Sequence, residues 1–161
     1  MEHTFIGLGG NMGEVKVNFE KAIGKIEELI GPVIRKSSLY KTEPWGRKDQ
    51  DPFLNMVIEV ATPLSAEQTL FHLLSIEKSL GRLRDSSNQY GPRSIDMDIL
   101  FFGEQIVNNG HLVIPHPKLH QRNFVLIPMA EISPEFCHPV LHKKISELLL
   151  ESSDEAQVTS A

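Results

Sequence analysis

The chain has 161 residues, of which 40% are hydrophobic and 23% charged, a composition typical of one globular domain with a substantial core. The formal net charge of −5 argues against a general nucleic-acid-binding protein, and no apolar run is close to the length, about 20 residues, that spans a bilayer. The single cysteine cannot form an internal disulfide and the N-terminus lacks the pattern of a signal peptide, so we expect a cytoplasmic protein without a membrane partner.

Two hydrophobic patterns alternate along the chain, one typical of strands and one typical of helices. The strand-like segments are residues 4–9, 33–41, 53–61 and 94–102, with short pieces at 107 and 112–114. The helical segments lie between Asn11 and Gly31, between Ser65 and Gly81, and over residues 123–132 and 143–150.

Capping residues mark the ends of the first two helices. Asn11 with Glu14, and Ser65 with Gln68, have the spacing of a capping box. Gly31, followed by proline, and Gly81 are typical helix stops.

The resulting order, β-α-β-β-α-β, is that of the ferredoxin-like fold. We therefore predict an α+β protein with an antiparallel sheet and helices packed on it. A single domain is expected over residues 1–150, and residues 151–161 read as a polar, loosely ordered C-terminal tail.

Asp96 and Asp98 stand out in the segment 94–102. Strand side chains alternate between faces, so both carboxylates point the same way while Ile95, Met97 and Ile99 point toward a core. Asp is depleted in strands, and two like charges so close together favour a cation between them. Mg²⁺ is typically held by one or two carboxylates plus phosphates, whereas the alternative is a solvent-facing edge strand.

The neighbouring residues favour a nucleotide site with a flat second ligand. Arginines suited to phosphate recognition gather between residues 82 and 122, and prolines flank His116 on a loop. Phe53 and Asn55 share a strand face, where an aromatic ring can stack on a heterocycle and a carboxamide can bond its edge; the alternative is an ordinary core Phe and an Asn at a strand end. The glycines of residues 7–13 do not have dinucleotide-binding spacing, and no P-loop motif is present.

These pieces together resemble 6-hydroxymethyl-7,8-dihydropterin pyrophosphokinase, an enzyme family of folate biosynthesis, over about residues 4 to 135. The most specific part is Gly91-Pro92-Arg93-Ser94-Ile95-Asp96-Met97-Asp98-Ile99. Supporting pieces are Gly9-Gly10-Asn11, Tyr40-Lys41-Thr42-Glu43-Pro44, Phe53-Leu54-Asn55, Glu77, Gly81-Arg82-Leu83-Arg84, Phe102-Gly103, Pro115-His116-Pro117 and Arg122-Asn123-Phe124.

The resemblance implies transfer of the pyrophosphoryl group of ATP to the pterin hydroxymethyl oxygen, with release of AMP. It implies two Mg²⁺ ions on Asp96 and Asp98, with Asp96 the nearest group to assist deprotonation of the hydroxymethyl group. Arg82 and Arg93 would support the transition state. The implied pterin-binding residues are Thr42, Glu43, Trp45, Phe53, Asn55 and Phe124, and the implied ATP-binding residues are Glu77, Arg84, Arg93, Ile99, His116 and Arg122.

The chain departs from the family pattern at several nucleotide-side positions, which are Gly10, Leu74, Tyr90, His111 and Pro117. These departures bear on ATP affinity and leave the chemistry intact. Two other functions stay open: a different Mg-dependent enzyme, such as a nucleotidyltransferase that releases pyrophosphate, and a non-enzymatic ferredoxin-like module that binds a small ligand. No interface helix or heptad is visible, so a monomer is expected.

Overall fold

The structure is a computed structural model, and it describes residues 1–42, 51–81 and 94–161. Its helices are α1 (Val15–Leu29), α2 (Ala66–Ser79), α3 (Asn123–Ile132) and α4 (Ile145–Glu151), with the 3-10 turn η2 (Leu119–Gln121). Its strands are β1 (Glu2–Gly10), β2 (Val33–Lys36), β3 (Tyr40–Thr42), β4 (Phe53–Thr62), β5 (Asp96–Phe102), β6 (Val107–Asn108), β7 (Val113–Ile114) and β8 (Val158–Ser160).

The main sheet has the ferredoxin-like arrangement that the sequence predicts. Its strand order is β5-β1-β4-β3-β8, and β2 also pairs with β4. Every pairing in it is antiparallel. The α+β fold and the β-α-β-β-α-β order are therefore confirmed, with β1 between β4 and β5.

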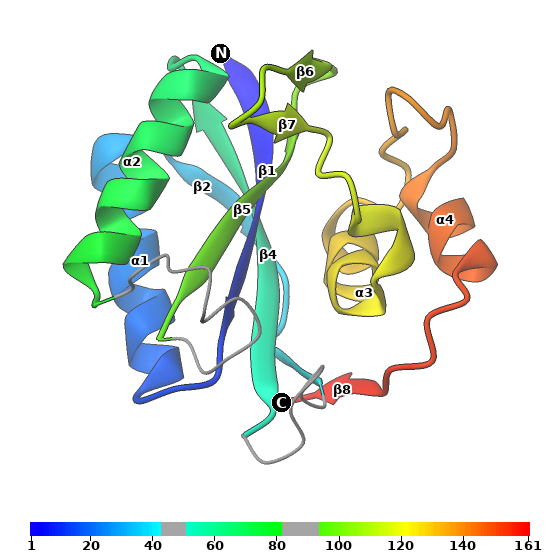
Figure 1. The fold of residues 1–161 in the computed structure, drawn as a ribbon, viewed down its shortest axis with the longest axis horizontal. Coiled ribbons are helices and arrows are strands. Elements are labelled where there is room, and N and C mark those ends of the chain that lie inside the picture. The colour runs from blue at the N-terminus through cyan, green and yellow to red at the C-terminus, as the bar shows by residue number, and fades with distance from the viewer. Residues whose placement is uncertain (43–50, 82–93) are drawn as a thin grey trace.

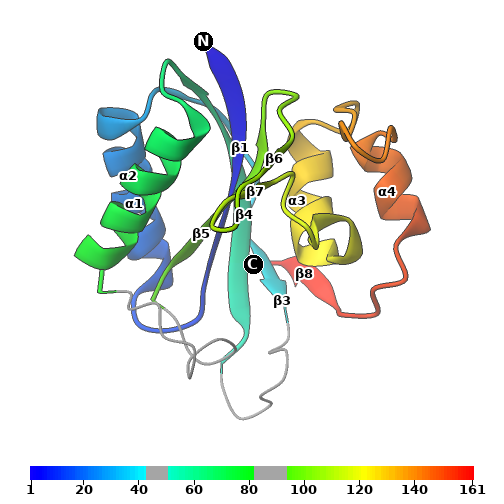
Figure 2. The same cartoon turned by 45° about the horizontal axis from the view of Figure 1, so that its top comes forward.

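Helices cover both faces of this sheet (Figure 1, Figure 2). α1 and α2 lie on one face, over a core that contains Ile6, Met56, Ile58 and Met97. α3 and α4 lie on the other, over a second core that contains Phe5, Val57 and both Leu100 and Phe101, which share this face because the pairing of β1 with β5 shifts register there. The inner strands are apolar on both faces because each face is covered by helices. None of the helices in the described ranges is long and apolar enough to cross a membrane.

Two local predictions are wrong. The predicted strand 33–41 is divided into β2 and β3, because the Ser37 hydroxyl accepts a hydrogen bond from the backbone N–H of Val57 (2.9 Å) and donates to the Ser38 carbonyl (2.8 Å). The Asn11–Glu14 capping box does not form. α1 begins at Val15, and the Asn11 amide donates to the Asp51 carbonyl (3.0 Å), which ties the turn after β1 to the segment before β4.

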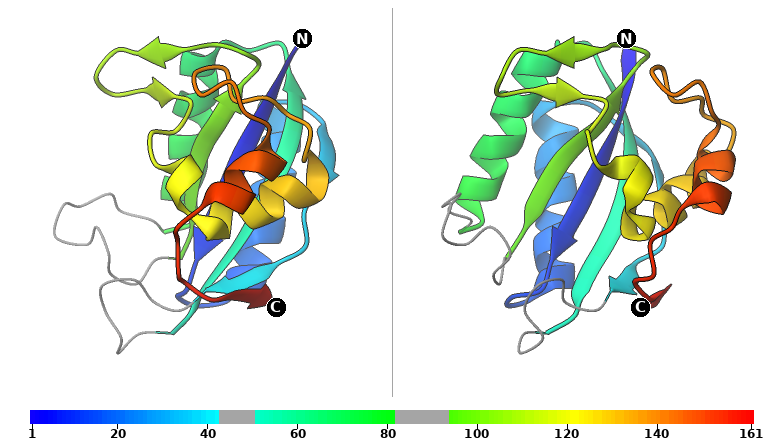
Figure 3. Two further views of the ribbon diagram at one scale, coloured as in Figure 1. Left: turned by 90° about the vertical axis from the view of Figure 1, so that its right-hand side faces the viewer. Right: turned by 45° about the vertical axis from the view of Figure 1, so that its right-hand side comes forward.

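The C-terminal segment differs most from its prediction. A loosely ordered tail was expected because residues 151–161 are polar, yet β8 pairs with β3 through Tyr40–Ser160, Lys41–Thr159 and Thr42–Val158. The prediction is wrong for these residues because backbone hydrogen bonds to an available sheet edge require no apolar side chains. Figure 3 shows the chain leaving α4 and ending beside β3.

The second capping box forms as the sequence predicts. The Ser65 hydroxyl accepts from the backbone N–H of Gln68 (3.1 Å), and the Gln68 side chain accepts from the backbone N–H of Ser65 (2.9 Å). Replacing Ser65 with Ala should lower the free energy of unfolding by about 1 kcal/mol, as loss of an N-cap does in general. Urea denaturation measures this. Ser65→Asp, which keeps an acceptor oxygen, should remain close to wild type, and equal losses in both variants would contradict the capping role.

Candidate active site

The two aspartates of β5 project from one face of the sheet. Asp96 and Asp98 are half-buried, and Met97 and Ile99, which alternate with them, are buried beneath α1 and α2. Leu100, two residues beyond Asp98 on the same face, belongs to the core under α3. The aspartate pair therefore lies on the face that α3 and α4 cover further along, as the strand alternation predicts.

A glycine separates the aspartate pair from the next polar side chain across the sheet. Gly9 of β1 pairs with Asp96 on one side and with Asn55 of β4 on the other. A Cβ atom on Gly9 would lie 2.8 Å from the Asn55 Nδ2 atom. Because Gly9 carries no side chain, the Asn55 amide can extend across β1 toward Asp96. No side chain of β1 stands between these two residues on this face of the sheet.

Strands β3 and β4 continue this polar row. Tyr40 pairs with Asn55 and Thr42 pairs with Phe53, so all four side chains lie on the same face as the aspartates. The Thr42 hydroxyl lies 3.5 Å from Asn55 Oδ1, which leaves Nδ2 directed toward Gly9. Thr42, Phe53 and Asn55, which the resemblance assigns to the pterin, are therefore neighbours.

Tyr40 connects this row to α3. Its hydroxyl donates to Glu131 Oε1 (2.6 Å), and the same carboxylate accepts from the backbone N–H and the hydroxyl of Ser38 (both 2.9 Å). The hydrogen bond to Glu131, with burial and the negative charge, raises the pKa of Tyr40 to about 12, so the hydroxyl stays a donor at neutral pH. Sequence reasoning missed Glu131, because nothing in the sequence shows which residue of α3 meets β3.

Glu77 holds the backbone of β5 from the face of the sheet that α1 and α2 cover. It is 1% exposed on α2, and its Oε2 accepts a hydrogen bond from the backbone N–H of Met97 (2.6 Å). Met97 lies between Asp96 and Asp98, so this carboxylate holds the backbone that carries both aspartates. The ribose contact that the resemblance implies for Glu77 stays a prediction.

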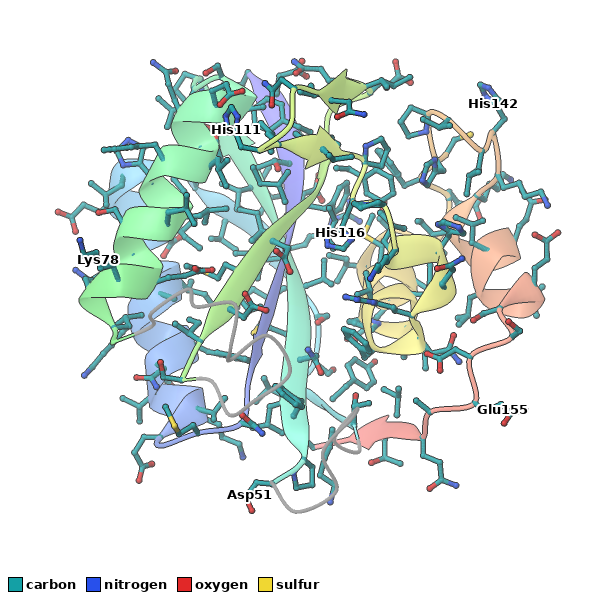
Figure 4. The ribbon with its side chains drawn as sticks, in the orientation of Figure 1. Asp51, Lys78, His111, His116, His142 and Glu155 are labelled. Atoms are coloured by element: carbon teal, nitrogen blue, oxygen red, sulfur yellow. The ribbon has the colours of Figure 1, made fainter. Side chains whose placement is uncertain are left out.

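His116 extends the site from the segment that follows β7 (Figure 4). Its backbone N–H donates to the Leu100 carbonyl (3.0 Å), and its ring Nδ1 accepts from the backbone N–H of Lys118 (3.2 Å). Burial, together with the positive charges of Arg122 and Lys118, lowers the pKa of His116 to about 4, against the opposing influence of Asp96. The ring is therefore neutral at pH 7 with its proton on Nε2, because Nδ1 is the acceptor.

Arg122 is the N-cap residue of α3, and Phe124 lies in its first turn. The Arg122 guanidinium lies over the Phe124 ring, 5.4 Å from its centroid, in a cation–π contact. Arg122 and Asp96 both act on the charge of His116, so the structure brings an arginine, a neutral histidine and an aspartate to one region.

The remaining predicted residues divide into two groups. The Ile99 side chain is buried, and the backbone contact to adenine that the resemblance implies for it stays a prediction. Glu43, Trp45, Arg82, Arg84 and Arg93 fall at 43–50 and 82–93, outside the described residues.

The opposing influences of Arg122 and Asp96 on His116 can be tested in solution. Arg122→Gln removes a positive charge and should raise the pKa of His116, whereas Asp96→Asn removes a negative charge and should lower it. NMR titration of the His116 Cε1 proton measures both shifts. Lys78→Gln, at an exposed position on α2 far from His116 in Figure 4, should leave this pKa unaltered. Shifts of the same sign in the first two variants would refute the arrangement.

Comparison with known proteins identifies the family. Residues 5–134 match the family model described as 7,8-dihydro-6-hydroxymethylpterin-pyrophosphokinase (HPPK). The chain is 34% identical over 153 residues to 2-amino-4-hydroxy-6-hydroxymethyldihydropteridine pyrophosphokinase of Aquifex aeolicus, which covers 95% of this chain and 94% of that protein.

Longer proteins contain a similar segment. The chain is 43% identical over 139 residues to the folic acid synthesis protein fol1 of Pneumocystis carinii, and the match covers 86% of this chain but 18% of that protein. A solved HPPK-DHPS structure from Plasmodium falciparum shares the fold, with a TM-score of 0.75 and 17% identity over 93% of this chain and 45% of that one. The chain thus spans less than half the length of both proteins. The family match covers most of the chain and includes the aspartate strand, so the chain belongs to the 7,8-dihydro-6-hydroxymethylpterin-pyrophosphokinase family.

Proposed function

We propose that this chain transfers the pyrophosphoryl group of ATP to the hydroxymethyl oxygen of 6-hydroxymethyl-7,8-dihydropterin and releases AMP, the reaction of its family in folate synthesis. The observation that carries the proposal is the row of side chains across β5, β1 and β4. Two carboxylates suited to a nucleotide-bound cation lie at one end, and Asn55 and Phe53, suited to a flat heterocycle, lie at the other. Gly9 leaves the space between the two ends without a side chain.

Asp96 and Asp98 fit a magnesium site completed by substrate. Among the residues that the structure describes, no group of three or more His, Cys, Asp or Glu side chains gathers as a complete protein metal site would. Mg²⁺ commonly takes one or two carboxylates and the oxygens of a bound nucleotide, so two half-buried aspartates suffice. We propose that the pair holds two Mg²⁺ ions, which would neutralise charge on the triphosphate during transfer.

Donors around Asp96 are suited to the phosphate chain. Arg122 offers a guanidinium that can bond two oxygens at once, and His116 offers a neutral Nε2–H. A neutral donor can bond a phosphate oxygen without adding a positive charge that would repel the cations on the aspartates. Arg82, Arg84 and Arg93 complete this set in the proposal, with Arg82 and Arg93 placed at the transition state, where positioning and charge stabilisation account for most of the catalysis.

The pterin is proposed to bind over β3 and β4. Asn55 presents a carboxamide whose orientation is set by Thr42 and by the space above Gly9, and a carboxamide can pair with both donors and acceptors on a pterin edge. Phe53 and Phe124 supply aromatic faces from β4 and α3, and the proposal adds Glu43 and Trp45, which lie in sequence between β3 and β4. The hydroxymethyl group would then point toward β5, where Asp96 is the group assigned to accept its proton.

Other properties expected from the sequence belong to the same proposal. We propose a cytoplasmic monomer with one catalytic domain over residues 1–150. The C-terminal segment, residues 151–161, adds a strand to the edge of the sheet of this domain. Light scattering and cell fractionation test the oligomeric state and the location. A nucleotidyltransferase would be distinguished by release of pyrophosphate, and a ligand-binding module by the absence of turnover.

The reaction itself gives the first test. With ATP, Mg²⁺ and 6-hydroxymethyl-7,8-dihydropterin, the protein should form AMP only when the pterin is present, as resolved by chromatography. The Asp96→Ala/Asp98→Ala double variant should lose at least about 100-fold in rate, because both groups that hold the charged nucleotide are removed. Chelation of Mg²⁺ should also stop the reaction and its re-addition restore it. Glu151→Gln, which alters an exposed carboxylate of α4, serves as the control. Pyrophosphate in place of AMP would discard the proposal.

Gly9 allows a test of the pterin half of the site. Gly9→Ala places a methyl group 2.8 Å from Asn55 Nδ2 and should displace that amide while the fold stays intact. The Kd for the pterin, measured by calorimetry, should rise at least about tenfold, as expected when a buried polar group loses its hydrogen-bonding partner. Gly7→Ala, two residues earlier in β1, brings a methyl group to an ordinary 3.5 Å from Leu100 Cδ2 and should bind the pterin as wild type does. Unchanged binding by both variants would remove Asn55 from the site.

A further inference from the structure

The first turn of α3 has no cap of its own. Its N-cap residue, Arg122, makes no side-chain capping bond, and the turn contains no acidic residue. The first N–H groups of a helix have no intrahelical acceptor and require another one. Here the acceptor comes from the C-terminal segment, since the backbone N–H of Asn123 donates to Asp154 Oδ2 at 2.7 Å.

Asp154 holds Asn123 at a second point. The Asn123 side-chain amide donates to the backbone carbonyl of Asp154 at 3.2 Å. Asp154 is itself held, because its Oδ1 accepts from the backbone N–H of Ala156 (3.0 Å) and its own N–H donates to the Ser152 hydroxyl (3.2 Å). The carboxylate is therefore oriented before it meets the helix, and a carboxylate at a helix N-terminus is electrostatically favourable.

The far end of the same segment is attached to the sheet. β8 pairs with β3 in the register Thr42–Val158, and the N–H of Ala161 donates to the Leu39 carbonyl (3.0 Å). The C-terminal segment thus bridges β3, which carries Thr42, and the start of α3, which carries Arg122 and Phe124. Figure 3 shows this path below α3.

The other end of α3 is held by contacts that do not involve Asp154. Glu131 bonds Tyr40 and Ser38, and the Arg35 guanidinium donates to the Ile132 carbonyl. Loss of Asp154 would therefore loosen the first turn of α3 while the last turn stays on the sheet.

We infer that Asp154 is a positioning residue for the substrate site, acting through Asn123 to hold Arg122 and Phe124 toward the aspartate strand. Asn123 lies directly between these two residues, so fixing its backbone and side chain fixes the backbone on both sides. The inference rests on the proposed function, which supplies the identity of the substrate. The two hydrogen bonds between Asp154 and Asn123 can be tested without any ligand.

The test compares Asp154→Ala and Asp154→Asn with wild type and with Glu155→Gln. Glu155 is exposed and points away from the body of the molecule in Figure 4, which makes it a matched control for charge. Hydrogen exchange read by mass spectrometry should show faster exchange over residues 122–126 in Asp154→Ala, with residues 129–132 unchanged. Asp154→Asn keeps one acceptor oxygen, so its exchange should be intermediate, and it also serves if the alanine variant does not fold.

Measurement of pterin binding tests whether Asp154 affects the substrate site. At a temperature where circular dichroism shows each variant folded, Asp154→Ala should raise the Kd for the pterin, in the presence of Mg²⁺ and a non-hydrolysable ATP analogue, about fivefold. KM for the pterin should rise in parallel while kcat changes little, because Asp96 and Asp98 are untouched. A residue with a general structural role would lower kcat and the active fraction together.

Two results would overturn the inference: wild-type exchange over residues 122–126 in Asp154→Ala, or faster exchange there with an unchanged Kd for the pterin. Failure of the proposed function is separate, since it would appear as absence of pterin-dependent AMP in the wild-type protein, and the exchange measurement would still decide whether Asp154 holds α3.

Discussion

The antiparallel register of β1 between β4 and β5 is the constraint on which the site depends. It places Gly9 opposite both Asp96 and Asn55, so a carboxylate and a carboxamide distant in sequence share one row of the sheet. A shift of one residue would turn the aspartates toward the α1 and α2 core, where an ionised pair without compensation is strongly disfavoured. The apolar residues that alternate with them, Met97 and Ile99, thus enforce the geometry of the site by being buried on the other face.

Helix α3 supplies the second half of the arrangement. Its first turn presents Arg122 and Phe124 above the sheet, and its last turn is joined to β2 and β3 through Ile132 and Glu131. Charge is distributed unevenly over this region. Burial and the charge of Arg122 lower the pKa of His116 despite the opposing charge of Asp96, so the site contains an arginine, a neutral donor and two carboxylates. A nucleotide with its cations fits such a set because the arginine is opposite in charge to the phosphates and the carboxylates are opposite in charge to the metal ions.

Much of the architecture could be predicted because it depends on local patterns. The alternation in β4 and β5, the helical spacing in α1 and α2, and the Ser65 capping box follow from residues close together in sequence. The errors arose where distant contacts override local preference. Asn11 donates to the Asp51 carbonyl and does not cap α1, and the Ser37 hydroxyl accepts from the Val57 N–H where a continuous strand was predicted. The polar C-terminal segment pairs with a sheet edge through its backbone.

For the site, the sequence by itself determined the common face of Asp96 and Asp98, the shared face of Phe53 and Asn55, and the resemblance that named the family. These follow from the two-residue period of a strand and from a motif that is contiguous in sequence. Only the tertiary structure decided that Gly9 separates Asp96 from Asn55, that Glu77 holds Met97, and that Asp154 caps α3. Each of these relations joins separate elements across the fold, and contacts of that kind depend on strand register and helix docking, which no local sequence pattern encodes.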